Sequence, residues 1–139
     1  MTPPADEALE IGDYRTLARF RHALRVFLHF SEEAARAEGL TPAQHQLLLA
    51  VRGHPDDGPP SITEVAEALQ LKTHSVGGLV DRAEDAGLVA SQPDAADARR
   101  RLITVTPAGE AILERLSALH RRELRRFRHE MGDLLRELD

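Results

Sequence analysis

The chain has 139 residues, no cysteine and a formal net charge of −5. This length predicts one domain with a hydrophobic core. No apolar run approaches the roughly 18 residues that span a membrane, and the acidic N-terminus lacks the apolar segment of a signal peptide. Without cysteine there are no disulfides, thiolate metal sites or thiol redox switches. We therefore expect a cytoplasmic protein. The acidic balance argues against general affinity for nucleic acid unless basic residues gather on one surface.

The first half of the chain has helical patterns separated by clear loop signals. Residues 1–12 form a predicted disordered acidic tail. From Asp13 to Ala37 apolar residues recur at helical spacing on a face too broad for a single partner. Thr41, Pro42 and Gln44 then supply an N-cap, a first-turn proline and a capping-box partner. A second helix is therefore predicted, ending at the Gly- and Pro-rich loop 53–60.

The second half predicts two more short helices, a hairpin and a long helix. Ser61 and Glu64 form another capping box, and a further helix runs from near Lys72 to about Ala86, with Gly87 suited to a left-handed residue after it. Residues 88–92 and 101–105 predict paired strands around a polar tip. A long helix with possible breaks follows over 108–138, capped by Thr106.

The aromatic residues lie only in the two terminal helical segments, at Tyr14, Phe20, Phe27, Phe30 and Phe127. Large side chains of this kind are favoured at protein interfaces. The terminal helices are therefore candidates for dimerisation, and the segment between them is a compact module of smaller residues.

Four motifs in this order resemble the MarR family of bacterial transcription regulators. They are the run from Glu64 to Leu69, the pattern from Val76 to Val89, Asp97-x-Arg99-Arg100, and the run from Leu102 to Gly109. The resemblance implies a mainly α fold with a small β-hairpin wing, in a single domain over 13–139. Within it, a winged helix-turn-helix over 41–106 would be flanked by long N- and C-terminal dimerisation helices over 13–40 and 107–139.

The second helix of a helix-turn-helix enters the major groove with its N-terminal half. The residues expected at that end are Lys72, Thr73, His74 and Ser75. Capping and solvent exposure explain Ser75 equally well.

Gly77 and Gly78 depart from the larger polar residues that the family usually has at such positions, and Gln70 replaces a glycine common in the turn. A glycine inside a helix costs up to about 1 kcal/mol relative to alanine. Either the backbone approaches DNA closely here, or recognition depends on DNA shape.

The hairpin tip carries the family's wing motif. We expect Arg99 to enter the minor groove, where narrow A·T tracts attract arginine. Arg100 and Arg101 would hold phosphates or brace the hairpin, and Asp97 would orient Arg82 or Arg99; these five residues complete the candidate DNA site. From Lys72 to Arg101 five basic and five acidic residues cancel. Affinity per subunit should be modest, which favours a homodimer on a pseudo-palindromic operator.

The expected function is sequence-specific binding of double-stranded DNA by a repressor that a small-molecule effector releases, as the resemblance implies. Catalytic motifs are absent, so we expect neither an enzyme nor a cofactor. Phe27, Phe30, His45 and Leu48 could line an effector cleft, but core packing explains them as well.

Three alternatives stay open. A helical adaptor without DNA binding would not need the Arg99 wing. A metal-responsive regulator is suggested by seven histidines, but no His-x-x-x-His occurs, and we expect no metal site. The basic run over 121–128 could be a second DNA contact, although a solvated helix face is the better interpretation.

Overall fold

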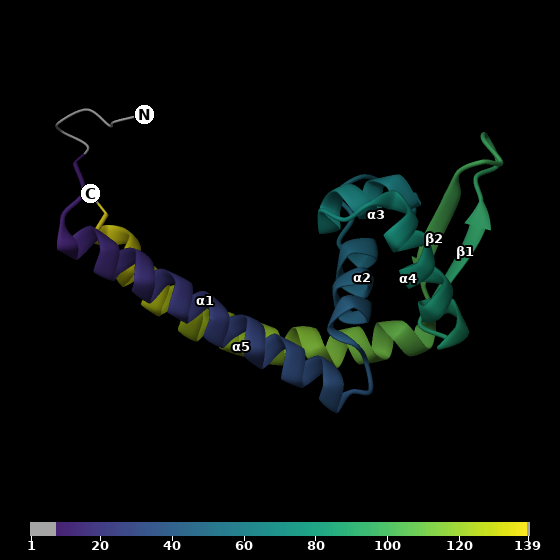
Figure 1. The fold of residues 1–139 in the computed structure, drawn as a ribbon. Coiled ribbons are helices and arrows are strands. Elements are labelled where there is room, and N and C mark those ends of the chain that lie inside the picture. Colours follow the sequence, from purple (N-terminus) through teal and green to yellow (C-terminus); the bar gives the residue numbers. More distant parts are fainter. Residues whose placement is uncertain (1–7, 139) are drawn as a thin grey trace. The chain divides into compact units, whose positions relative to one another are not determined.

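The structure is a computed structural model that describes residues 8–138 (Figure 1). Five helices and a two-stranded antiparallel sheet follow one another along this part of the chain. They are α1 (Ile11–Ala37), α2 (Pro42–Arg52), α3 (Ile62–Leu69), α4 (Thr73–Asp85), β1 (Val89–Pro93), β2 (Arg101–Val105) and α5 (Pro107–Arg136). The predicted fold class, mainly helical with a small hairpin, is confirmed. None of the described helices is long and apolar enough to cross a membrane.

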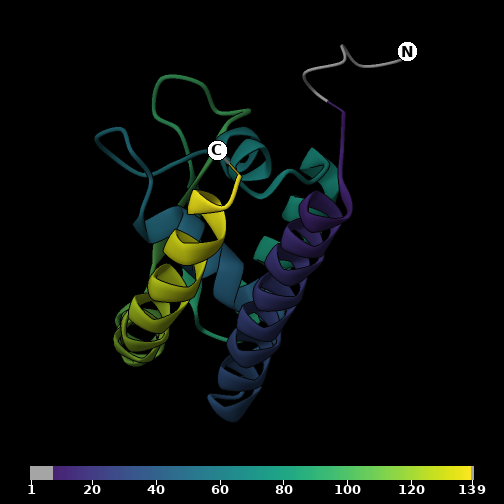
Figure 2. The same cartoon turned by 90° about the vertical axis from the view of Figure 1, so that its left-hand side faces the viewer.

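The chain divides into two compact units. The helical-pair unit comprises the described residues up to Ser31 together with those from Leu119 onward, and the winged unit is Glu32–Ala118. In the helical-pair unit, α1 and the second part of α5 lie side by side (Figures 1 and 2). Their contact is small: Ala23, Met131 and Leu134 are buried, with Phe20 and Phe127 packed against them.

An aromatic cluster extends this contact. The rings of Phe27 and Phe127 have centroids 5.2 Å apart, and the His120 ring lies against both Phe27 and Phe30. His120 Nε2 is 2.8 Å from the hydroxyl of Ser31, which is buried. Within this unit, Phe27 and Phe30 therefore act in packing between the two helices.

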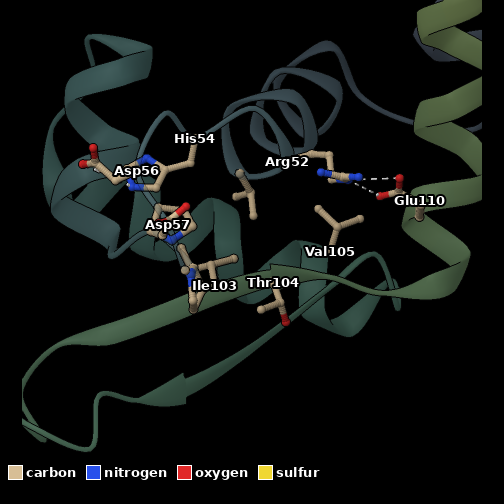
Figure 3. Close-up of a pocket in the computed structure, with 12 residues that line it drawn as sticks. Arg52, His54, Asp56, Asp57, Ile103, Thr104, Val105 and Glu110 are labelled. Carbon is tan, nitrogen blue, oxygen red and sulfur yellow. Dashed lines mark hydrogen bonds and ion pairs between the residues drawn. The ribbon is translucent and has the colours of Figure 1, made fainter.

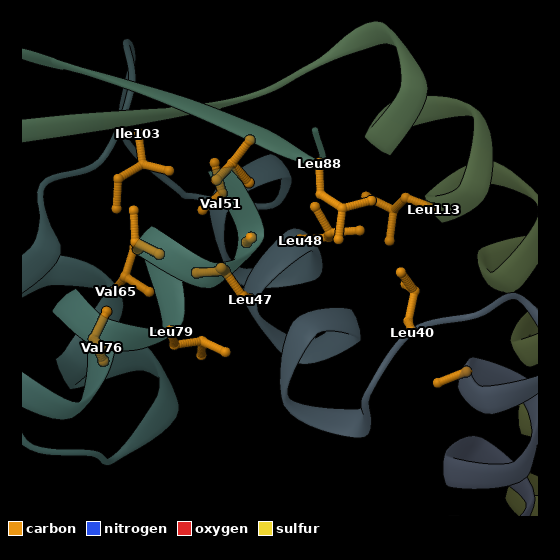
Figure 4. Packing of buried hydrophobic residues seen from close by; sticks show 14 of the residues in the cluster. Leu40, Leu47, Leu48, Val51, Val65, Val76, Leu79, Leu88, Ile103 and Leu113 are labelled. Carbon is orange, nitrogen blue, oxygen red and sulfur yellow. The ribbon is translucent and has the colours of Figure 1, made fainter. Parts of the chain in front are cut away.

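The winged unit has the larger core. It is built from apolar faces of α2, α3 and α4, from the hairpin and from the first turns of α5 (Figure 4). Its fully buried side chains include Leu47, Leu48, Val65, Val76, Val80 and Ile103. His45 is buried in the same unit. Core packing thus accounts for Leu48.

Both predicted capping boxes are present. Thr41 Oγ1 accepts from the Gln44 N–H at 3.1 Å, and Gln44 Oε1 accepts in return from the Thr41 N–H at 3.0 Å. Ser61 and Glu64 make the same reciprocal pair, with both bonds at 3.2 Å. Each pair satisfies two backbone donors that a helix start leaves without partners, which fixes where α2 and α3 begin.

The turns after α4 and α3 both contain a residue with a left-handed backbone, of which only Gly87 was predicted. Gly87 has φ +76° and follows α4 as expected. Gln70 has φ +54°, and among the described residues it alone combines a side chain with a left-handed backbone. Its Nε2 donates to the Glu67 carbonyl at 2.8 Å, so the side chain caps α3 while the backbone carries the strain that glycine would avoid.

The structure differs from the prediction in some details of the first helix, the first strand and the last helix. The first helix begins at Ile11 rather than Asp13. The Asp13 carboxylate accepts from the Glu10 N–H at 2.8 Å through Oδ2, and this bond caps a first helical turn that begins before Asp13. Residues 11 and 12 of the predicted tail are therefore helical, and residues 1–7 lie outside the described part. β1 begins at Val89, one residue late. α5 runs without a break from Pro107 to Arg136, since no proline follows Pro107.

The hairpin is joined tightly to α5. In β1 and β2, Val89 pairs with Val105 and Pro93 with Arg101. Thr106 then donates from its hydroxyl to the Gly87 carbonyl at 2.6 Å and accepts from the Gly109 N–H at 3.1 Å. A Cβ on Gly109 would lie 2.2 Å from the Leu88 carbonyl oxygen. Only a glycine at position 109 lets the first turn of α5 pack this close to the backbone of Leu88, just before β1.

We predict that Gly109→Ala destabilises the protein by about 1–3 kcal/mol, because the added methyl group must displace backbone rather than a flexible side chain. Urea unfolding followed by circular dichroism measures the change. Gly12→Ala is the matched control, since a Cβ at Gly12 meets nothing within 4 Å. Equal stability of the two variants would contradict the close approach.

Candidate nucleic-acid interface

The start of α4 differs from the starts of α2 and α3. Lys72 occupies the N-cap position, and its side chain makes no capping hydrogen bond. Lys72, Thr73, His74 and Ser75 are all exposed. Unbonded N–H groups and the positive end of the helix dipole favour an anion at such a place. The first turn of α4 therefore offers both side-chain and backbone donors to an external ligand.

The opposite face of α4 holds it in place. Val76, Leu79, Val80 and Ala83 are buried against the core of the winged unit. This burial fixes the rotation of α4 about its axis, because side chains three or four residues apart share one helix face. The exposed first turn is therefore held rigidly by its own helix.

The two glycines of α4 are not required by packing within the chain. A Cβ on Gly77 would meet nothing within 4 Å, and a Cβ on Gly78 would lie 3.3 Å from Arg82 Nη1, the end of a flexible side chain. Both residues are partly exposed. The absence of side chains here leaves the α4 backbone open to close approach from outside.

Arg99 lies in the loop between β1 and β2, beyond their last paired residues, Pro93 and Arg101. Figure 1 shows the hairpin that carries this loop. The Arg99 side chain is 93% exposed. Asp97 Oδ1 accepts from the Arg99 N–H at 3.0 Å and lies 3.3 Å from Arg99 Nε. Of the two arginines considered for Asp97, the structure pairs it with Arg99.

Arg100 and Arg101 are bound within the winged unit. Arg100 reaches Glu64 Oε1 at 3.0 Å and Asp94 Oδ2 at 3.3 Å. Arg101 donates to the Ser91 hydroxyl at 2.9 Å and to Asp81 Oδ1 at 2.8 Å. These contacts join the hairpin to α3 and to α4. In this structure both arginines brace the hairpin.

Glu64 was not a predicted site residue, although its place in the capping box was. Its Oε1 accepts from the Ser61 N–H and from Arg100, while its Oε2 lies 3.1 Å from His54 Nε2. The backbone hydrogen bond from Ser61 lowers the pKa of Glu64, with further lowering from the Ser61 hydroxyl and from the charges of His54 and Arg100, against the opposing effect of burial. The sequence marks Glu64 only as a helix cap, because the other partners are more than eight residues away.

A shallow polar cavity of about 400 Å³ lies beside this group (Figure 3). Its wall is made by the end of α2, the loop before α3, β2 and the first turn of α5. Arg52 forms an ion pair with Glu110 at 3.1 Å across one end. Nothing in the sequence pattern indicated this cavity, since its lining comes from three separate stretches of the chain.

Three packed helices followed by a two-stranded hairpin, with one helix start exposed beside it, define a winged helix-turn-helix protein. A sequence model of the MarR family matches residues 38–100. The transcriptional activatory protein BadR of Rhodopseudomonas palustris is 31% identical over 113 residues. That match covers 81% of this chain and 64% of BadR.

Two further matches agree. The HTH-type transcriptional repressor NicR of Pseudomonas putida is 29% identical over 118 residues, covering 81% of this chain and 72% of NicR. The solved structure of BpsR from Bordetella bronchiseptica, whose DNA binding is regulated by 6-hydroxynicotinic acid, superposes with a TM-score of 0.65 at 26% identity. That alignment covers 86% of this chain and 94% of BpsR.

The chain is thus similar to MarR family regulators over about four fifths of its length, and it spans less than two thirds of BadR. The resemblance of the four sequence motifs to this family is thereby confirmed. The curated relatives are transcription regulators by name, in agreement with the expected function.

We predict that Arg101→Ala loosens the hairpin and lowers the stability of the protein by about 0.5–1 kcal/mol. Its bonds involve charged groups but are partly exposed, which reduces their net value. Hydrogen–deuterium exchange should rise across residues 89–105. Arg99→Ala is the comparison and should change neither exchange nor stability. Equal effects of both variants would contradict the division of roles between the two arginines.

Proposed function

We propose that this regulator binds double-stranded DNA in a sequence-specific manner as a homodimer and represses transcription until a small molecule releases it. The observation that carries the proposal is the exposed, uncapped start of α4 on a helix whose opposite face is buried. In the proposed domain arrangement, 41–106 is the DNA-binding module, and 13–40 with 107–139 are dimerisation helices.

The first turn of α4 is suited to the major groove. Thr73 and His74 would contact base edges, and Ser75 with the Lys72 ammonium would contact bases or phosphates. The backbone N–H groups of this turn are suited to a phosphate. Arg82 lies in the last turn of α4, is exposed and adds a positive charge to the same helix.

The open space at Gly77 and Gly78 supports a close backbone contact with DNA. Two helix-interior glycines lower stability without improving the packing of the chain, so a gain outside the chain explains them best. That gain would be an approach of the α4 backbone to the sugar-phosphate chain that a side chain would prevent.

At the wing, Arg99 is the arginine suited to the minor groove. Asp97 holds its backbone and approaches its Nε, which leaves the outer nitrogens of the guanidinium directed to solvent. Arg100 and Arg101 would act on DNA indirectly, by fixing the hairpin that presents Arg99.

Dimerisation is supported by the helical-pair unit. Its buried core is small, and many large apolar side chains on α1 and the end of α5 stay exposed: Ile11, Tyr14, Leu17, Val26, Leu28, Leu124 and Leu135. A monomer rarely exposes so many large apolar side chains on two short stretches of helix unless another surface covers them. A second copy would also bring a second winged unit to the same DNA, so the dimer would bind far more tightly than one unit alone.

The relatives differ in the sign of regulation, since BadR is an activator by name and NicR a repressor. We propose repression here, with release by a small molecule in the way that 6-hydroxynicotinic acid regulates BpsR. Such release requires the effector to favour a form that does not bind DNA. Action on chromosomal DNA places the protein in the cytoplasm.

The function is tested by fluorescence anisotropy with a duplex from the DNA upstream of the protein's own gene, over a salt series. Wild type should bind with a steep salt dependence, because phosphate contacts release counterions. Arg99→Ala should weaken binding by about 1–3 kcal/mol.

Arg122→Ala is the matched control, since Arg122 is an exposed arginine of the basic run over 121–128. A loss equal to that of Arg99→Ala would make the basic run a DNA contact and remove the special role of the wing. No binding by wild type at low salt would replace the DNA-binding proposal with that of a helical adaptor.

We further predict that Gly77→Ala stabilises the protein by up to about 1 kcal/mol, because the methyl group enters open space in a helix. The same change should weaken DNA binding if the backbone approaches DNA there. Thermal unfolding and the anisotropy assay measure the two effects separately. A stabilised variant with unchanged DNA affinity would show that Gly77 is not needed for close approach.

A further inference from the structure

Three potential metal ligands meet at the entrance to α3. His54 and Asp56 come from the loop after α2, and Glu64 lies in the first turn of α3. Their nearest donor atoms all lie within 4.8 Å of one another. His54 and Asp56 also line the cavity beside β2 (Figure 3).

His54 is held with one nitrogen directed at the carboxylates. Its side chain is only 13% exposed, and Nε2 lies 3.1 Å from Glu64 Oε2 and 3.9 Å from Asp56 Oδ2. The N–H of His54 donates to the Val51 carbonyl. The N–H of the preceding residue, Gly53, donates to the Leu49 carbonyl, so both residues are bonded to the end of α2. The backbone at the end of α2 thus positions the imidazole.

The two oxygens of Glu64 have separate partners. Oε1 accepts from the Ser61 N–H and from Arg100, so it is committed to the helix cap and to the wing. Oε2 faces His54. A ligand could therefore bind Oε2 without breaking either contact of Oε1.

We propose that His54 Nε2, Asp56 Oδ2 and Glu64 Oε2 bind a divalent transition-metal ion, with zinc as the best match. One imidazole and two carboxylates are ligands that zinc accepts, and two carboxylates balance the charge of the ion. Three protein ligands leave one tetrahedral position for water. The guanidinium of Arg100 pairs with Glu64 Oε1 and with Asp94, so these contacts do not involve the proposed ligand oxygen of Glu64.

The distances need only a small adjustment. With bonds of about 2.0–2.2 Å, ligands of a tetrahedral zinc ion lie about 3.4 Å apart. His54 and Glu64 are near this spacing already. Asp56 is the more distant ligand, and because its side chain is 79% exposed on a loop it can move toward the other two.

A bound ion would tie the loop before α3 to the first turn of that helix. Glu64 also holds Arg100 of the wing, so the ion would strengthen the junction from which both α3 and the hairpin are positioned. Zinc binding should therefore raise the thermal stability of the protein, since a ligand that binds only the folded state stabilises it.

The test uses the untagged full chain, which has no cysteine to compete for the ion. Zinc binding is measured by competition with a chromophoric chelator, and thermal unfolding is followed with and without zinc. We expect one zinc ion per chain and a rise in Tm. His54→Gln and Asp56→Asn should each weaken binding at least about 10-fold and abolish the Tm rise.

His29→Gln is the matched control, because His29 is an exposed histidine of α1. This variant should bind zinc like wild type. The proposal is overturned if wild type binds no zinc, or if His54→Gln and Asp56→Asn both leave the affinity unchanged while folding normally by circular dichroism. None of these measurements involves DNA, so they stand apart from the test of the proposed function.

Discussion

The carboxylate of Glu64 lies where the winged unit is assembled. It completes the capping box that starts α3, holds Arg100 of the hairpin and faces His54 of the preceding loop. Helix start, wing and loop are distant in the sequence, and a single partly buried group joins them. The backbone hydrogen bond from Ser61, with the charges of His54 and Arg100, lowers the pKa of that carboxyl. The orientation of the wing relative to α3 therefore depends on a residue that would not itself contact DNA.

The acidic composition of the chain is consistent with a DNA-binding surface once the ion pairs are known. Of the five basic residues between Lys72 and Arg101, three are paired inside the winged unit. Arg100 and Arg101 pair with Glu64, Asp81 and Asp94, and Arg99 pairs with Asp97 of the same loop. Lys72, Arg82, Arg99 and Arg100 are exposed at the start of α4, on α4 and in the hairpin loop. Acidic side chains here serve to position basic ones, and a count of charges along the sequence hides this arrangement.

Close packing and open space have opposite meanings at the glycines of the winged unit. At Gly109 a side chain is excluded by the carbonyl of Leu88, so the residue is explained by the fold. At Gly77 there is room for one, so the residue is explained only by something outside the chain. Gln70 shows a third case, in which a side-chain hydrogen bond accompanies a left-handed backbone that glycine would adopt without strain.

The sequence by itself determined the order and most boundaries of the elements, because capping boxes, prolines and apolar periodicity act over a few residues. It also carried the resemblance to the MarR family, and it predicted the exposed residues at the start of α4 and the wing arginine. It could not assign Arg100 and Arg101 to bracing, since their acidic partners lie 6 to 36 residues away. Nor could it bring His54 and Asp56 to Glu64, because that cluster forms only when the loop before α3 folds back onto the helix. Contacts between segments depend on the packed core, and only the tertiary structure decided them.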